Sequence, residues 1–82
     1  MTETLKVVKY PNRRLYSPDL NRYITLAVVG DYWDRDWEVN VFVHRTWVDV
    51  TIPTLLEVVR ERVRSGRLRV TRQQLRALGA KA

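Results

Sequence analysis

Cationic side chains concentrate around one short segment near the start of this 82-residue chain. Lys9, Arg13 and Arg14 flank the dipeptide Pro11-Asn12. Proline presets φ for the second position of a β-turn and asparagine tolerates the third, so this dipeptide predicts a tight bend. The bend would gather the three cations at one edge of the molecule, where they could bind the phosphates of a polyanion.

Aromatic rings are interleaved with these cations. Planar side chains can stack on bases or contact sugars, and a two-stranded ribbon fits the major groove of DNA. Asn12 and one arginine could read adenine or guanine, since both side chains can form bidentate hydrogen bonds. Alternatively, the dipeptide only forms a turn and the tyrosines only pack across strands. The candidate DNA-contacting residues here are Lys9, Tyr10, Asn12, Arg13, Arg14, Tyr16, Arg22 and Tyr23.

Charge is distributed unevenly along the chain, whose net charge is +6. Residues 1–26 carry five cations and two anions, residues 27–56 carry two and five, and residues 57–82 carry eight and two. Basic ends around an acidic centre favour a phosphate backbone over a membrane surface, because a membrane-bound helix also needs a broad apolar face. Double-stranded DNA is the expected partner, and an Arg-rich surface that only aids solubility is the alternative.

Catalysis is not expected from this sequence. A chain of 82 residues leaves little room for a deep active site, and it has no cysteine, one histidine and no Gly-rich phosphate loop. The carboxylates between Asp31 and Glu38 lack the glycine and distal glutamate of a calcium loop. We therefore expect no enzyme, no catalytic residue, no metal and no cofactor. Without an apolar run or a secretory signal, a cytoplasmic location and no membrane partner are expected.

The first half of the chain is expected to be mainly extended. Branched and aromatic residues predict a strand over residues 5–10 and extended segments over 13–16 and 22–26, which would form an N-terminal β-hairpin. Residues 38–43 and 47–50 are expected to form a second β-hairpin. The histidine, His44, would lie at the surface in the turn between them.

Two segments have the apolar spacing of a helix. The first covers residues 27–37, with Thr25 as its N-terminal cap. The second covers residues 51–64 and has the strongest pattern, with Thr51 or Thr54 as its cap. The expected fold class is α+β: a small single domain with an N-terminal β-hairpin, a short helix, a second β-hairpin, a strong helix and a basic helical tail.

Residues 65–82 form the basic C-terminal tail, beyond an expected DNA-binding domain of residues 1–64. A short strand is expected over residues 68–70. A helix should follow it, since Thr71 and Gln74 have capping-box spacing.

Arg72 and Arg76 of this tail helix are further candidates for DNA contact. Their types suit a groove-reading helix, so residues 54–78 could be taken for a helix-turn-helix. The connection between the two helices is longer than the three or four residues that this motif prefers. Phosphate contact by the tail is therefore favoured over base reading.

Three tryptophans are more than the core of so small a domain obviously needs. An aromatic patch with a charged rim could pair subunits, so a homodimer or higher homo-oligomer is expected. A symmetric dimer would place two ribbons on two half-sites. The alternative function is an oligomerising protein interaction module, in which the acidic middle of one chain meets a basic end of another.

The segment Lys9–Leu26, KYPNRRLYSPDLNRYITL, resembles the opening motif of the PHB/PHA accumulation regulator DNA-binding domain family, which reads roughly KYPNRRLYDTxxSRYITL. The likeness covers about residues 6–60. The chain departs from the family at Ala27 and Val28, where relatives have acidic residues, and near Trp47, where they often have glycine. The resemblance implies a DNA-binding repressor of genes for polyhydroxyalkanoate synthesis or granule proteins, with the polymer as a further partner. Longer members carry a separate region after this domain.

Overall fold

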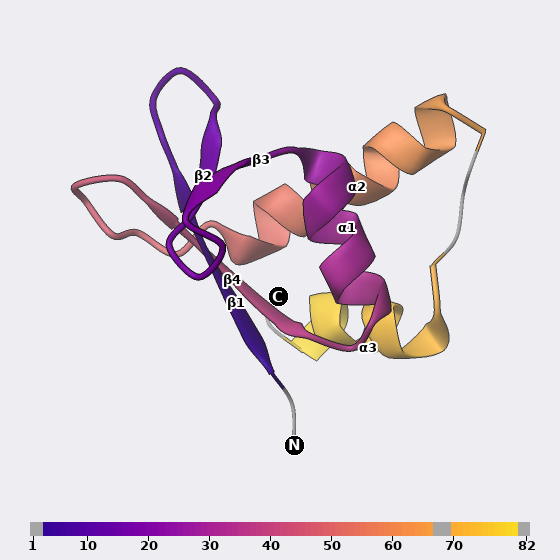
Figure 1. Cartoon of the computed structure of the whole chain (residues 1–82). Helices are drawn as coiled ribbons and strands as arrows, with labels where there is room; N and C mark the ends of the chain where they lie inside the picture. The colour runs from indigo at the N-terminus through magenta and orange to yellow at the C-terminus, as the bar shows by residue number, and fades with distance from the viewer. Residues whose placement is uncertain (1–2, 67–69, 81–82) are drawn as a thin grey trace.

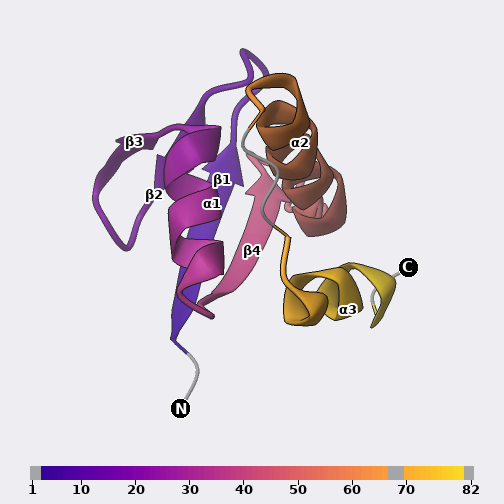
Figure 2. The same cartoon turned by 90° about the vertical axis from the view of Figure 1, so that its right-hand side faces the viewer.

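The computed structural model describes residues 3–66 and 70–80 of the chain. Within these residues a four-stranded sheet packs against helices, which confirms the α+β class (Figures 1 and 2). The elements are β1 (Thr4–Lys9), β2 (Leu15–Ser17), β3 (Arg22–Ile24), α1 (Leu26–Asp34), β4 (Glu38–Val43), α2 (Thr51–Arg64) and α3 (Arg72–Ala80).

The sheet combines an antiparallel meander with one parallel pair, in the order β3-β2-β1-β4. Strands β1, β2 and β3 follow one another as antiparallel neighbours, so all three predicted extended segments take part in the N-terminal hairpin arrangement. Strand β4 pairs in parallel with β1 from Thr4 opposite Glu38 to Lys9 opposite Val43. Helix α1 supplies the crossover that a parallel connection requires.

The second predicted hairpin is present as β4 and an irregular return segment. The Val43 N–H donates to the Val48 carbonyl at 2.9 Å, and residues 47–50 contain one isolated bridge, Phe42 with Asp49. Trp47 has a φ of 56°, outside the range of an extended strand. The return segment therefore differs from the predicted strand at its first residue.

Alternation of side chains along the strands places one face of the sheet in the core. Leu5, Val7 and Val41 have no exposed surface. Helices α1 and α2 cover this face, and Figures 1 and 2 show both on the same side of the sheet. The buried core comprises Leu5, Val7, Leu15, Ile24, Val29, Trp33, Val39, Val41, Leu55 and Val58.

Helix α1 begins as the sequence predicts. The Thr25 hydroxyl accepts a hydrogen bond from the Val28 N–H at 3.3 Å, which satisfies one free donor of the first turn. The helix ends at Asp34, before the predicted end at residue 37, and Asp36 follows with a φ of 63°.

The prediction that Thr51 or Thr54 caps α2 is wrong. The Thr51 N–H is bound by the Asp49 carboxylate at 2.9 Å, and the Thr54 hydroxyl donates to the Val50 carbonyl at 2.8 Å. The Thr51 hydroxyl accepts from the Val41 N–H at 2.8 Å. The Thr51 hydroxyl therefore binds a backbone N–H at the free edge of β4. No spacing of residues in the sequence indicates this contact.

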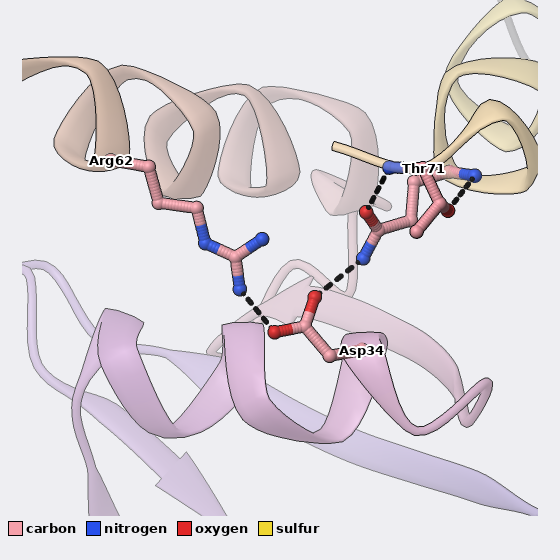
Figure 3. Close-up of polar contacts among 4 residues, drawn as sticks. Asp34, Arg62 and Thr71 are labelled. Atoms are coloured by element: carbon pink, nitrogen blue, oxygen red, sulfur yellow. Dashed lines mark hydrogen bonds and ion pairs between the residues drawn. The ribbon is translucent and has the colours of Figure 1, made fainter. Parts of the chain in front are cut away.

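A hydrogen-bonded network docks α3 onto the rest of the domain (Figure 3). Asp34 accepts from Arg62 of α2 at 2.7 Å and from the Gln74 side-chain amide at 2.8 Å. The predicted capping box is confirmed, since Thr71 Oγ1 accepts from the Gln74 N–H at 3.0 Å and Gln74 Oε1 accepts from the Thr71 N–H at 2.8 Å. The predicted strand at residues 68–70 falls largely on residues 67–69, outside the described residues.

Replacement of Thr51 by valine should lower the free energy of unfolding by about 1–3 kcal/mol, because it leaves the buried Val41 N–H without a partner. Thr54→Val is the matched control, since Thr54 is equally buried but its hydroxyl binds a carbonyl that the helix already uses. Urea unfolding of both variants measures the difference. Equal losses would contradict the assigned role of Thr51.

Candidate nucleic-acid interface

The bend between β1 and β2 has the predicted geometry. The Arg13 N–H donates to the Tyr10 carbonyl at 2.9 Å, so Pro11 and Asn12 occupy the second and third positions of a turn. The Tyr10 N–H donates to the Arg14 carbonyl at 2.9 Å and closes the hairpin. Arg13 has a φ of 67°, a left-handed conformation that glycine usually supplies in a three-residue hairpin loop.

Asn12 contributes to the bend itself. Its Oδ1 accepts a hydrogen bond from the Arg14 N–H at 3.1 Å. The predicted bidentate reading of adenine needs an oxygen and a nitrogen of the same amide. Asn12 is exposed, but its oxygen already has a partner in the bend, so the structure favours a positioning role.

The arginines around the bend are accessible. Arg13, Arg14 and Arg22 are exposed, and no carboxylate within the described residues pairs with them. Lys9 differs, because its Nζ lies 3.5 Å from Glu57 Oε1 of α2 and its side chain is 30% exposed. The arginines are therefore the cations with most freedom to bind an external phosphate.

The tyrosines form a cluster on one face of the sheet. Tyr16 and Tyr23 meet edge to face with ring centres 5.3 Å apart, and the Tyr16 hydroxyl donates to Asn21 Oδ1 at 2.8 Å. Tyr10 lies 4.3 Å from His44, centre to centre, so the histidine is half-buried in the cluster. Tyr10 and Tyr16 are also half-buried, which fits the packing alternative, whereas Tyr23 is 55% exposed.

Helix α2 faces the bend across a polar groove of about 600 Å³. Lys9 and Arg13 line it from the hairpin, and Arg60 and Arg64 line it from the helix. The groove thus holds four cations and two carboxylates. Its full lining is Lys9, Arg13, Leu15, Leu26, Thr54, Glu57, Arg60, Glu61 and Arg64.

Sequence reasoning missed Arg60 and Arg64 as candidate contacts. Both are exposed and lie four residues apart, on one face of α2 and away from its buried stripe. Arg64 makes an exposed ion pair with Glu61 at 3.6 Å, a contact that solvent weakens. The signal that could have identified them is this cationic spacing opposite the apolar positions.

Arg72 and Arg76 are exposed on α3, but the structure does not bring them to the bend. In both Figure 1 and Figure 2 helix α3 lies at the end of the molecule opposite the β1–β2 bend. A ligand at the bend would have to extend along the molecule to reach these two arginines. The two candidate surfaces are therefore separate.

Two of the three tryptophans are too buried to contribute to the expected exposed patch, whereas Trp47 is 54% exposed. Trp33 is only 5% exposed in the core, and Trp37 is half-buried against Tyr32 with ring centres 4.9 Å apart. Within residues 3–66 and 70–80, no three histidine, cysteine or acidic side chains converge on a possible metal site. In the same part of the chain, no helix is long and apolar enough to cross a membrane.

Comparison with known proteins gives two matches. The family model described as PHB/PHA accumulation regulator DNA-binding domain matches residues 6–66, which include the bend and α2. An uncharacterized protein from Allochromatium vinosum is 38% identical over 60 residues, which cover 73% of this chain and 39% of that protein. The chain thus matches about two-fifths of the length of this relative. No solved structure matches.

The left-handed conformation of Arg13 predicts an unusual effect on stability. Arg13→Gly should raise the free energy of unfolding by about 1 kcal/mol, because glycine adopts positive φ without a steric penalty. Arg14→Gly removes the same charge from a residue without positive φ, and it should lower stability. Thermal unfolding of the two variants compares them. A lower melting temperature for Arg13→Gly than for Arg14→Gly would contradict the assignment of strain.

Proposed function

Since the chain belongs to the PHB/PHA accumulation regulator DNA-binding domain family, we propose that it regulates transcription by binding double-stranded DNA with the β1–β2 bend and the facing side of α2. The bend would approach the duplex first. Arg13 and Arg14 would contact phosphates, and Arg60 and Arg64 would extend the cationic surface along the groove. The family description also implies a binding function rather than catalysis.

The observation that carries this proposal is the exposure of Arg13 and Arg14 without a carboxylate partner in the described residues. An arginine in an internal ion pair must break that pair before it binds DNA. An exposed, unpaired arginine instead displaces counterions from the phosphate backbone, which favours association. The left-handed Arg13 supports the same interpretation, because the fold alone would favour glycine there.

Lys9 and Glu57 would hold the bend and α2 in place rather than bind DNA through their charges. Their 3.5 Å contact joins the base of the bend to α2 and thereby holds the two walls of the groove together. Glu57 and Glu61 also limit how closely a phosphate can approach the floor of the groove. We therefore expect DNA to lie across the rim, where Arg13, Arg60 and Arg64 are exposed.

Base reading would come from the strands beside the bend. A two-stranded ribbon fits the major groove, and arginine can bind the guanine edge through two hydrogen bonds. Arg22 is the exposed candidate in this proposal, since Arg14 is assigned to a phosphate. Asn12 would hold the bend in shape rather than read a base.

We extend the proposal to repression of genes for polyhydroxyalkanoate synthesis or granule proteins, by a cytoplasmic homodimer or higher homo-oligomer on a repeated site. Its support is the family description and the sequence motif that precedes α1. Release by the polymer belongs to the same proposal. The relative from Allochromatium vinosum is longer than the matched region, so a polymer-responsive part would be sought outside that region.

Titration of a labelled duplex at several salt concentrations tests DNA binding. A sequence selected from random duplex fragments supplies the probe. With about three to six phosphate contacts per chain, log K should fall with log[salt] at a slope of about −3 to −5. The joint replacement of Arg13 and Arg14 by alanine should make this slope shallower by about 2, because two contacts are lost.

The matched control removes the same number of arginines from α3, as Arg72→Ala with Arg76→Ala. It should change the slope and the affinity less than the bend variant does. A larger loss in the α3 variant would transfer DNA recognition to the tail. An affinity that does not depend on salt in the parent chain would contradict phosphate binding altogether.

A further inference from the structure

The sheet has a second face that no helix of the described chain covers. Figures 1 and 2 show α1, α2 and α3 on one side of the strands only. Because side chains alternate along a strand, the residues between the buried ones face the other way. This open face presents Lys6 and Val8 from β1, Tyr16 from β2, Tyr23 from β3 and Phe42 from β4.

A single row of side chains crosses all four strands of the open face. The backbone register aligns Tyr23 with Tyr16, Tyr16 with Val8, and Val8 with Phe42. Val8 is only 5% exposed although no helix of the described residues lies over this face, and the rings of Tyr16 and Tyr23 lie 5.3 Å apart, centre to centre. Tyr23, at the end of the row, is 55% exposed.

Trp47 lies beside this surface at the end of the loop after β4, where its N–H donates to the Val43 carbonyl at 2.8 Å and closes the turn. Its φ is 56°, which is rare for a bulky residue, and its side chain is 54% exposed. The Lys6 ammonium lies 5.5 Å from the centre of its ring, which places Trp47 beside the open face. Because the indole is largely exposed, its burial offsets little of the cost of the strained backbone. Residues with strained backbones concentrate at binding sites.

The charges around these rings are mainly positive. Lys6 lies beside Trp47, and the Arg14 guanidinium lies 5.4 Å from the centre of the Tyr23 ring. The Asp19 carboxylate accepts a hydrogen bond from the Lys6 N–H at 2.8 Å, and Glu38 lies at the far end of β4. Each exposed ring therefore has a cation next to it, and this pairing complements a base with its phosphate.

We propose that the open face binds unpaired bases of single-stranded nucleic acid. One base would stack on Tyr23 and another on Trp47, while Arg14 and Lys6 bind the adjoining phosphates. Tyr23 lies on β3 and Trp47 lies on the return segment beyond β4. Their backbones are four strand spacings apart, roughly 19 Å, a span within the reach of the about 4–16 nucleotides that single-strand-binding folds cover. Duplex DNA could not use these rings in the same way, because its bases are stacked on each other.

The proposal goes beyond duplex binding at the bend, because it adds Trp47 and Lys6, which have no role there; Arg14 serves both proposals. Trp47→Gly is the variant that discriminates between the two proposals. Glycine accepts the positive φ of this position, so the substitution removes only the ring. Tyr23→Thr removes the second ring and retains a residue that favours strands. Leu75→Ala is the matched control, since Leu75 is 58% exposed on α3, away from the open face.

Anisotropy titrations of labelled dT12 and U12 test the proposal. The parent chain should bind both, and Trp47→Gly and Tyr23→Thr should each weaken binding by about tenfold. Leu75→Ala should bind as the parent does. Trp47→Gly should bind the duplex probe with an affinity within about twofold of the parent. A failure of the single-strand proposal is therefore distinguishable from a failure of the duplex proposal.

Two results would overturn the proposal. The first is equal affinity of the parent, Trp47→Gly and Tyr23→Thr for both oligonucleotides, which would show that only phosphates are bound. The second is a dimer in sedimentation that Trp47→Gly dissociates without nucleic acid, which would assign the open face to a second copy of the chain. A preference for U12 over dT12 that depends on Trp47 would support the proposal and would identify RNA as the preferred single-stranded ligand.

Discussion

The pairing of β1 with β4 is the constraint on which both candidate surfaces depend. Six residues of each strand lie in parallel register, and Val7 and Val41 are fully buried beneath the helices. Once these positions face inward, alternation forces Val8 and Phe42 to the opposite side. The same pairing carries the end of β4 to the base of the bend, where His44 contacts Tyr10.

Several residues other than glycine have positive φ in the described part of the chain, and their types differ in how easily they adopt it. Asn21 and Asp36 have positive φ, and their residue types adopt it with little penalty. Arg13, Arg45 and Trp47 are exposed and of types that rarely adopt it. Arg13 lies at the bend, and Arg45 and Trp47 lie in the loop after β4. Two of these three positions, Arg13 and Trp47, belong to the surfaces that we propose for binding.

Local signals made much of the fold predictable. The turn at Pro11-Asn12, the cap at Thr25 and the Thr71 capping box depend on neighbouring residues, and each is present as expected. The parallel pairing of β1 with β4 and the Thr51 bond to β4 depend on residues far apart in the chain, and the sequence alone gave no indication of either. The bend was predicted, whereas the placement of Arg60 across the groove from the bend depends on how α2 packs.

The most direct test of duplex binding at the bend is to follow the backbone amide resonances of the labelled chain during titration with duplex DNA at low salt. This account predicts the largest shifts at residues 12–14 and in the second half of α2, with small shifts in α3. Shifts confined to residues 72–79, with an unchanged bend, would contradict it.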